Sequence, residues 1–349
     1  MKNLLAAITV CFLALSSATS AAQGLLTLEA LENEKEYVSI ADAILNPTAV
    51  LKLDLMGEGL TEIPAEVFTL PNLQVLYLYK NNLKTLPAQI AKLTNLQAIY
   101  LDNNLLESLP PEIGLLKNLK VISLYKNNLT KLPEEISNLA KLEFLFVSSN
   151  KLQSLPESIG KLINLKEADL SFNELTTLPE SFGKLSKLTL LFLTSNKLTK
   201  LPNSVTQLSA LTEFYLDDNT LTMFPGAGMR LIDLKIFSIS NNQLTMLPEE
   251  IGALVKLESL YLSGNQLTAL PNGIGGCLNL KYLDVSSNKI VEIPSGIRKL
   301  INVQDMNFFD NRIRTVPEWV GELPALKAIG LFGNNVDVFP LSLSKHDKY

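Results

Sequence analysis

The stretch that decides the fold is residues 73–95, which read LQVLYLYKNNLKTLPAQIAKLTN. Its first leucines alternate with other residues, and this alternation predicts a short β-strand with the leucines on one face. Asn81 follows where the chain must turn off the strand, and its amide can satisfy backbone groups of its own coil and of the neighbouring coil. The Leu86-Pro87 step holds the chain extended and can open a short helical turn.

The same frame returns every 23 residues along most of the chain, and a fixed period of about 20–50 residues is typical of a solenoid. We therefore predict an α/β solenoid in the shape of a horseshoe, with a parallel β-sheet on the concave face and short helical or 3-10 turns on the convex face. The asparagines predicted to form a structural ladder along the stack are Asn81, Asn104, Asn127, Asn150, Asn173, Asn196, Asn219, Asn242, Asn265, Asn288, Asn311 and Asn334.

The repeat also divides the chain. Residues 1–22 contain Lys2, an apolar stretch and a run of small residues from Ser16 to Ala22, which is the pattern of a signal peptide cleaved after Ser20 or Ala22. The apolar stretch is short for a membrane span. Residues 50–348 hold about thirteen coils, the last of them truncated.

Residues 23–49 are expected to form an N-terminal helical cap, because a solenoid exposes its core at both ends. We predict one helix that ends at Asn46-Pro47. Its apolar face is predicted from the spacing of Tyr37, Ile40, Ala41, Ile44 and Leu45. At the other end the cap is thin, so we expect that edge, with Phe332 and Phe339, to fray or to self-associate weakly.

Charge and cysteine content restrict the partners and the chemistry. The formal net charge is −5, which argues against nucleic acid because phosphate binding needs a basic surface. Removal of a signal peptide leaves Cys277 as the single cysteine, so no intramolecular disulfide is expected. Its place in the frame predicts a small buried hydrophobic side chain.

Outward-facing strand positions form the candidate ligand-binding surface, since contiguous exposed apolar patches mark interaction sites. In the first half these positions hold Tyr77, Tyr79, Tyr100, Tyr125, Phe144 and Phe146, joined by Val75 and Val121. In the second half they hold Glu167, Asp169, Glu213, Asp217, Asp218, Asp284, Asp305 and Asp310, with the aromatic line continued by Phe192, Tyr215, Tyr261 and Tyr282. The alternative is that the aromatic rings only pack against each other across neighbouring strands.

An enzyme is not predicted. His346 is the only histidine and lies in the tail, so neither a serine nor a cysteine nucleophile has a base to activate it. Neither a GxGxxG motif nor a phosphate-binding loop occurs. Carboxylates on an open sheet face, such as Glu167 with Asp169, favour a docking surface over acid–base catalysis.

No cofactor and no metal are predicted either. Calcium could be bridged by Glu213, Asp217 and Asp218, but these residues do not lie in an EF-hand-type loop.

The chain also resembles a known family. Residues 41–55 (ADAILNPTAVLKLDL) and 60–67 (LTEIPAEV) are similar to the entry segment of the secreted leucine-rich repeat proteins of Leptospira-type spirochaetes. Later coils, for instance residues 132–136 (LPEEI), resemble that family too and have the 23-residue repeat of its bacterial type. This resemblance implies an exported binding protein in the periplasm, at the cell surface or outside the cell, with adhesion to a host surface protein as one role.

Two function classes stay open. The first is a secreted protein-binding module that uses the concave face, with tyrosines as anchors. The second is a glycan or cell-wall binding protein in which the same rings stack on sugars. No stretch of the mature chain is long and apolar enough to be expected to span a membrane.

Overall fold

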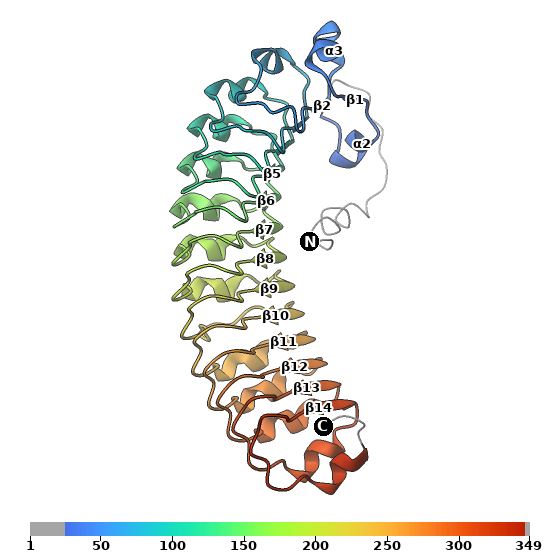
Figure 1. Ribbon diagram of the computed structural model, residues 1–349, viewed down its shortest axis with the longest axis vertical. Coiled ribbons are helices and arrows are strands. Elements are labelled where there is room, and N and C mark those ends of the chain that lie inside the picture. The colour runs from blue at the N-terminus through green and yellow to red at the C-terminus, as the bar shows by residue number, and fades with distance from the viewer. Residues whose placement is uncertain (1–24, 346–349) are drawn as a thin grey trace.

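A computed structural model of the protein describes residues 25–345, a curved solenoid whose coils stack in sequence order (Figure 1). The strands pair in one parallel sheet of fourteen strands, in the order β1 to β14. The register is regular, since Leu76 pairs with Ile99 and Ile99 pairs with Ile122. This confirms the predicted solenoid with a parallel sheet. The predicted signal peptide, residues 1–22, lies outside the described residues.

The elements are short and evenly spaced. The strands are β1 (Glu36–Tyr37), β2 (Lys52–Asp54), β3 (Val75–Tyr77), β4 (Ala98–Tyr100), β5 (Val121–Ser123), β6 (Phe144–Phe146), β7 (Glu167–Asp169), β8 (Leu190–Phe192), β9 (Glu213–Tyr215), β10 (Ile236–Ser238), β11 (Ser259–Tyr261), β12 (Tyr282–Asp284), β13 (Asp305–Asn307) and β14 (Ala328–Gly330). The α-helices are α2 (Leu28–Glu32) and α3 (Ile40–Leu45). The 3-10 helices are η1 (Pro47–Ala49), η2 (Ala65–Thr69), η3 (Ala88–Lys92), η4 (Pro111–Leu115), η5 (Glu134–Asn138), η6 (Glu157–Lys161), η7 (Glu180–Lys184), η8 (Asn203–Gln207), η9 (Glu249–Ala253), η10 (Asn272–Gly276), η11 (Ser295–Lys299), η12 (Glu318–Glu322) and η13 (Leu341–Lys345).

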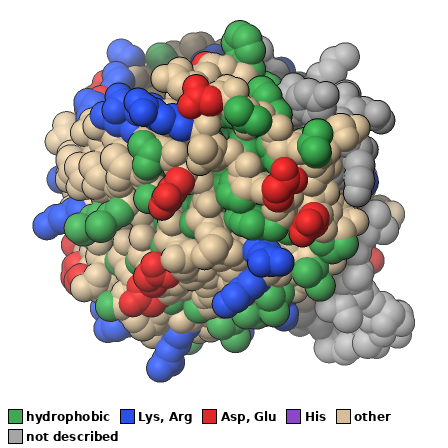
Figure 2. Space-filling model, turned by 90° about the horizontal axis from the view of Figure 1, so that it is seen from below, with side chains coloured by type: hydrophobic (Ala, Val, Ile, Leu, Met, Phe, Trp, Pro, Cys, Tyr) green, Lys and Arg blue, Asp and Glu red, His purple; other side chains and the backbone are tan. Residues whose placement is uncertain are grey.

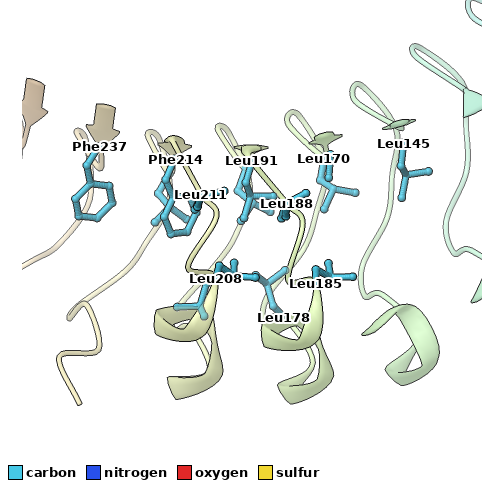
Figure 3. Close-up of a cluster of buried hydrophobic side chains, with 14 of the residues drawn as sticks. Leu145, Leu170, Leu178, Leu185, Leu188, Leu191, Leu208, Leu211, Phe214 and Phe237 are labelled. Carbon is cyan, nitrogen blue, oxygen red and sulfur yellow. The ribbon is translucent and has the colours of Figure 1, made fainter. Parts of the chain in front are cut away.

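The core is a continuous row of apolar side chains between the sheet and the 3-10 helices. Figure 3 shows its centre, where Leu170, Leu191 and Phe214 descend from successive strands toward Leu185 and Leu208 on the convex side. All five side chains are fully buried. Because each coil buries its leucines only against its neighbours, the stack is stabilised by contacts between adjacent coils.

The ladder asparagines join consecutive coils. Asn104 donates through Nδ2 to the carbonyl oxygens of Leu78 (2.9 Å) and Leu101 (3.0 Å), and its Oδ1 accepts from the amide of Leu83 (3.0 Å). The residue just before most ladder asparagines takes a left-handed backbone conformation, and Phe172 does so with φ of 54°. The eighth coil position is therefore the turn off the strand and not part of the strand face.

The N-terminal segment differs from the single helix that the sequence predicted. Tyr37 lies in β1 and pairs with Leu53, and α3 begins only after Ser39, whose hydroxyl caps it. In α3 the buried side chain is Ala43, whereas Leu45 is 82% exposed. The predicted apolar face is therefore wrong, because α3 has six residues and apolar spacing over so short a helix does not fix its orientation.

The other end is closed by η13, in which Leu343 is buried against the last coil. Beside it, Phe332 is 80% exposed and Phe339 is also exposed, as expected for a thin cap. Between residues 25 and 345, no helix has the length and hydropathy needed to cross a bilayer.

Candidate functional site

The N-terminal part of the concave face is covered by the chain itself. Helix α2 lies beside the strands on their concave side (Figure 1), and Leu31 at its centre is only 1% exposed. Leu31 forms a separate buried cluster with three outward-facing strand residues, Val75, Ala98 and Val121. We call residues 25–35 the N-terminal arm.

Hydrogen bonds fix the arm in place. The side chain of Gln74 accepts from the backbone amide of Leu26 (3.0 Å), and Gln97 donates to the carbonyl oxygen of Leu26 (2.7 Å). Gln97 also donates to Gln74 (2.7 Å), so the two amides act as one clamp on the arm backbone. At the other end of the arm, the buried Lys52 ammonium donates to the carbonyl oxygen of Glu32 (3.4 Å).

The arm partly buries Tyr77 and Tyr100, two of the aromatic residues predicted to bind a ligand. Tyr77 and Tyr100 stack with ring centroids 4.9 Å apart and are half-buried against the arm cluster. Burial, followed by the nearby Glu36 and Asp54 carboxylates, raises the pKa of Tyr77 to about 12, and burial also raises the pKa of Tyr100.

Val75 and Val121, expected to be exposed, are buried under the arm, so that expectation is wrong. We call the strand surface beneath and beside the arm the covered zone; it consists of Val75, Tyr77, Ala98, Tyr100, Val121, Phe144 and Phe146.

At the middle of the concave face, aromatic and acidic side chains alternate. Phe192 and Tyr215 stack with centroids 4.9 Å apart, and the Tyr215 hydroxyl donates to Glu213 (2.8 Å). Burial, reinforced by Asp169 and Glu213, raises the pKa of Glu167 to about 7. This region therefore holds a carboxyl group that titrates near neutral pH.

Asp217 and Asp218 are partly engaged in structure. Asp217 accepts from the Ser238 hydroxyl (2.5 Å) and from the Ser240 amide (2.8 Å), and so braces the neighbouring coil. Asp218 lies at the turn position with φ of 56° and accepts from Asn241 (2.9 Å). Across residues 25–345, no three acidic, histidine or cysteine side chains gather in a way that suits a metal ion.

The C-terminal part of the concave face is open. A hollow of about 330 Å³ lies over β11 to β14, and its walls include Tyr261, Tyr282 and Phe309, which are 37%, 42% and 42% exposed. Its floor is low because β14 carries the small residues Ala328 and Gly330 at the outward positions. A side chain at Gly330 would meet the Phe309 ring.

Two carboxylates, Asp284 and Asp305, also line this hollow. We call Tyr261, Tyr282, Asp284, Asp305 and Phe309 the open zone.

The remaining sequence candidates fall between these two zones or beside them. Tyr79 lies edge-on to Tyr77, with centroids 6.3 Å apart, and both Tyr79 and Tyr125 are half-buried. The alternation of strand residues predicts that Tyr261 and Tyr282 lie on the same surface, but it does not single out Phe309. The signal for the hollow was the pair of small residues in β14, next to large ones in the preceding coils.

Cys277 is no nucleophile in this arrangement. Its side chain is fully buried in the core and lies 3.3 Å from the carbonyl oxygen of Ile251. Burial raises its pKa to about 12, which keeps the thiol protonated. His346 lies outside the described residues.

Comparisons with known proteins agree with this geometry. Family models described as leucine rich repeat match residues 49–106, 94–152, 147–198 and 163–221, and a leucine-rich repeat region model matches residues 227–337. A leucine-rich repeat protein of Leptospira interrogans is similar at 31% identity with a TM-score of 0.63, over 90% of this chain and 100% of that chain. The chain belongs to the leucine-rich repeat proteins. Scaffolds of this family are typically non-enzymatic and bind other proteins.

Two further solved structures are similar in fold and were solved with ligands. The plant peptide hormone receptor RGFR1 in complex with RGF2 is 25% identical with a TM-score of 0.62, over 86% of this chain and 57% of that chain. The PEPR1–AtPEP1 structure is 27% identical with a TM-score of 0.68, over 82% of this chain and 46% of that chain. None of the curated proteins matches the sequence.

Proposed function

We propose that this protein is a secreted, non-enzymatic protein-binding module whose docking surface is the concave face from β7 to β14. The observation that carries the proposal is the open zone, where accessible aromatic rings lie next to carboxylates in a hollow. Exposed aromatic side chains in a pocket are the usual anchors of protein interfaces. The outward positions of β7 to β14 carry no lysine or arginine, so the surface suits a partner with basic groups.

Export beyond the inner membrane is part of the proposal. It is supported by the signal-peptide pattern of residues 1–22, and it is what the resemblance of residues 41–55 to secreted leucine-rich repeat proteins implies. A host surface protein is the partner that such a location favours. Weak self-association through the exposed Phe332 edge is a second, independent contact that we propose for the same protein.

A glycan or cell-wall ligand is the second candidate. It is favoured by the flat stacked pair Phe192 and Tyr215 and by Glu213 beside it, an arrangement in which a ring stacks on a sugar and a carboxylate accepts its hydroxyls. The hollow over β11 to β14 suits a protein side chain better, because aromatic rings and carboxylates line it together with the small residues of β14.

The test compares two matched double variants. Tyr261→Ala with Tyr282→Ala removes open-zone anchors, whereas Tyr79→Ala with Tyr125→Ala removes two tyrosines near the arm. Immobilised proteins are probed with host-surface extract, envelope extract and a glycan array. We expect the first variant to lose about 2 kcal/mol or more of protein binding, roughly thirtyfold, and the second to bind as the parent does.

Two outcomes contradict the proposal. If the glycan array alone gives binding, the ligand class is wrong. If the Tyr79 and Tyr125 variant loses the protein partner while the Tyr261 and Tyr282 variant keeps it, the docking surface is not the open zone.

A further inference from the structure

The hollow in the open zone has the chemistry of a site for one particular side chain. Asp284 is on β12 and pairs in register with Tyr261 and Asn307, while Asp305 on β13 pairs with Tyr282 and Ala328. Since adjacent strands lie about 4.8 Å apart, each carboxylate has a tyrosine ring on the strand before it and a smaller residue on the strand after it.

The charges around the hollow leave its two carboxylates without a basic partner from the sheet. Lys281 lies on the flank of the same strand, but its ammonium pairs with Glu258 (2.6 Å). Lys327, on the flank before β14, donates to Gln304 (2.8 Å). Both lysines are thus engaged with residues outside the hollow, and the charged side chains that line the hollow are the two carboxylates.

The shape of the walls selects among cations. A lysine ammonium is a compact, strongly hydrated charge, whereas a guanidinium is planar, stacks on aromatic faces and binds carboxylates through two parallel hydrogen bonds. Tyrosine faces attract such a cation within about 6 Å of the ring centroid. A hollow of about 330 Å³ with two tyrosines, a phenylalanine and two carboxylates matches an arginine side chain.

We propose that the hollow formed by Tyr261, Tyr282, Asp284, Asp305 and Phe309 binds an arginine side chain of an extended peptide segment. The inference rests on the proposed function and names the residue of the partner that the open zone recognises. The tyrosines hold the guanidinium plane, and the two carboxylates accept its hydrogen bonds.

The test uses synthetic hexa-arginine and hexa-lysine peptides with the full mature protein, and follows binding by calorimetry and by the NMR signals of labelled tyrosines. We expect hexa-arginine to bind more tightly than hexa-lysine and to shift the signals of Tyr261 and Tyr282 but not those of Tyr77 and Tyr100. Equal affinity for the two peptides, or shifts spread over all four tyrosines, overturns the proposal.

Matched variants separate recognition from general charge attraction. Asp284→Asn with Asp305→Asn should weaken hexa-arginine binding at least about tenfold, because two charged hydrogen-bond acceptors are lost. Asp169→Asn is the control, since Asp169 has the same strand position as Asp284 and makes the same bond to the amide two residues on (3.0 Å against 2.9 Å). If this control weakens binding as much as the double variant, the acids act through the overall field and no arginine site exists.

Tyr282→Ala tests whether the aromatic walls of the hollow select arginine over lysine. This variant should weaken the binding of hexa-arginine more than it weakens the binding of hexa-lysine. If these peptide tests fail, the arginine site is contradicted but the proposed function is not. The extract experiment still tests the proposed function, because a protein partner can require Tyr261 and Tyr282 in another way. If instead the Tyr261 and Tyr282 variant keeps the protein partner in the extract experiment while the native protein prefers hexa-arginine, only the proposed function is contradicted.

Discussion

The covered zone and the open zone lie on the same sheet, but the chain packs its own arm over the first and leaves the second exposed. In the covered zone, Leu31 of the arm packs on Val75, Ala98 and Val121, and its backbone is held by two glutamines. In the open zone nothing from residues 25–345 lies over Tyr261 and Tyr282, and small residues in β14 leave a hollow. An aromatic residue on the concave face is therefore a binding candidate only where the chain has not already used it for its own packing.

The largest expected contrast is in stability. Leu31→Ala should destabilise the arm by about 2–5 kcal/mol, since it deletes a buried side chain from a closed cluster. Tyr282→Ala in the open zone should change stability by less than about 0.5 kcal/mol. Chemical denaturation and hydrogen exchange of residues 26–32 measure the two effects. Similar losses in both variants would remove the distinction between the zones.

The ladder gives a second, smaller contrast between the centre and the C-terminal end. Asn173 is buried and donates to the carbonyl oxygens of Val147 (2.9 Å) and Leu170 (3.1 Å), while Asn334 makes equivalent bonds at a half-buried site. Asn173→Ala should cost about 1–3 kcal/mol because buried backbone groups lose their partner. Asn334→Ala should lower the melting temperature less, and equal shifts would show that the end coil is as cooperative as the centre.

The boundary between the zones should show a modest pH dependence. Glu167 has a folded-state pKa of about 7, above its ordinary value, mainly because it is buried. The folded state therefore binds this proton more tightly, so its contribution to stability is complete below the ordinary pKa and is lost as the pH rises through about 7. Between about pH 5 and pH 8 the melting temperature of the parent should fall relative to Glu167→Gln. Parallel curves for the two proteins would show that Glu167 does not titrate there.

Much of the fold could be predicted because each coil repeats the same local rule. Asn104 follows a strand in the sequence, and in the structure it bonds to its own coil and to the coil before it. The arm could not be predicted in the same way, because the docking of the five-residue α2 depends on Val75, Ala98 and Val121, which belong to three separate coils further along the chain. A signal existed in the outward row Val75, Ala98 and Val121, which is small and apolar where a solvated face would be polar.

The candidate site could likewise be predicted only in part. The alternation of strand residues correctly indicated that Tyr261 and Tyr282 face outward. It could not separate them from Tyr77 and Tyr100, since all four tyrosines alternate with buried residues on their strands and so point outward, whether at the end of the strand, as Tyr261 does, or at its start, as Tyr282 does. The depth of the hollow arises from Gly330, whose effect depends on the Phe309 ring of the preceding coil.

Reactivity of individual tyrosines tests the contrast between the two zones most directly. Nitration of the native protein, read by peptide mass spectrometry, reports both access to the ring and ionisation of the phenol. We predict that Tyr261 and Tyr282 react first and that Tyr77 and Tyr100 react slowly, because the arm covers them and their pKa values are raised. Leu31→Ala should speed the reaction of Tyr77 and Tyr100 alone. Equal reaction rates for all four tyrosines in the native protein would contradict the account.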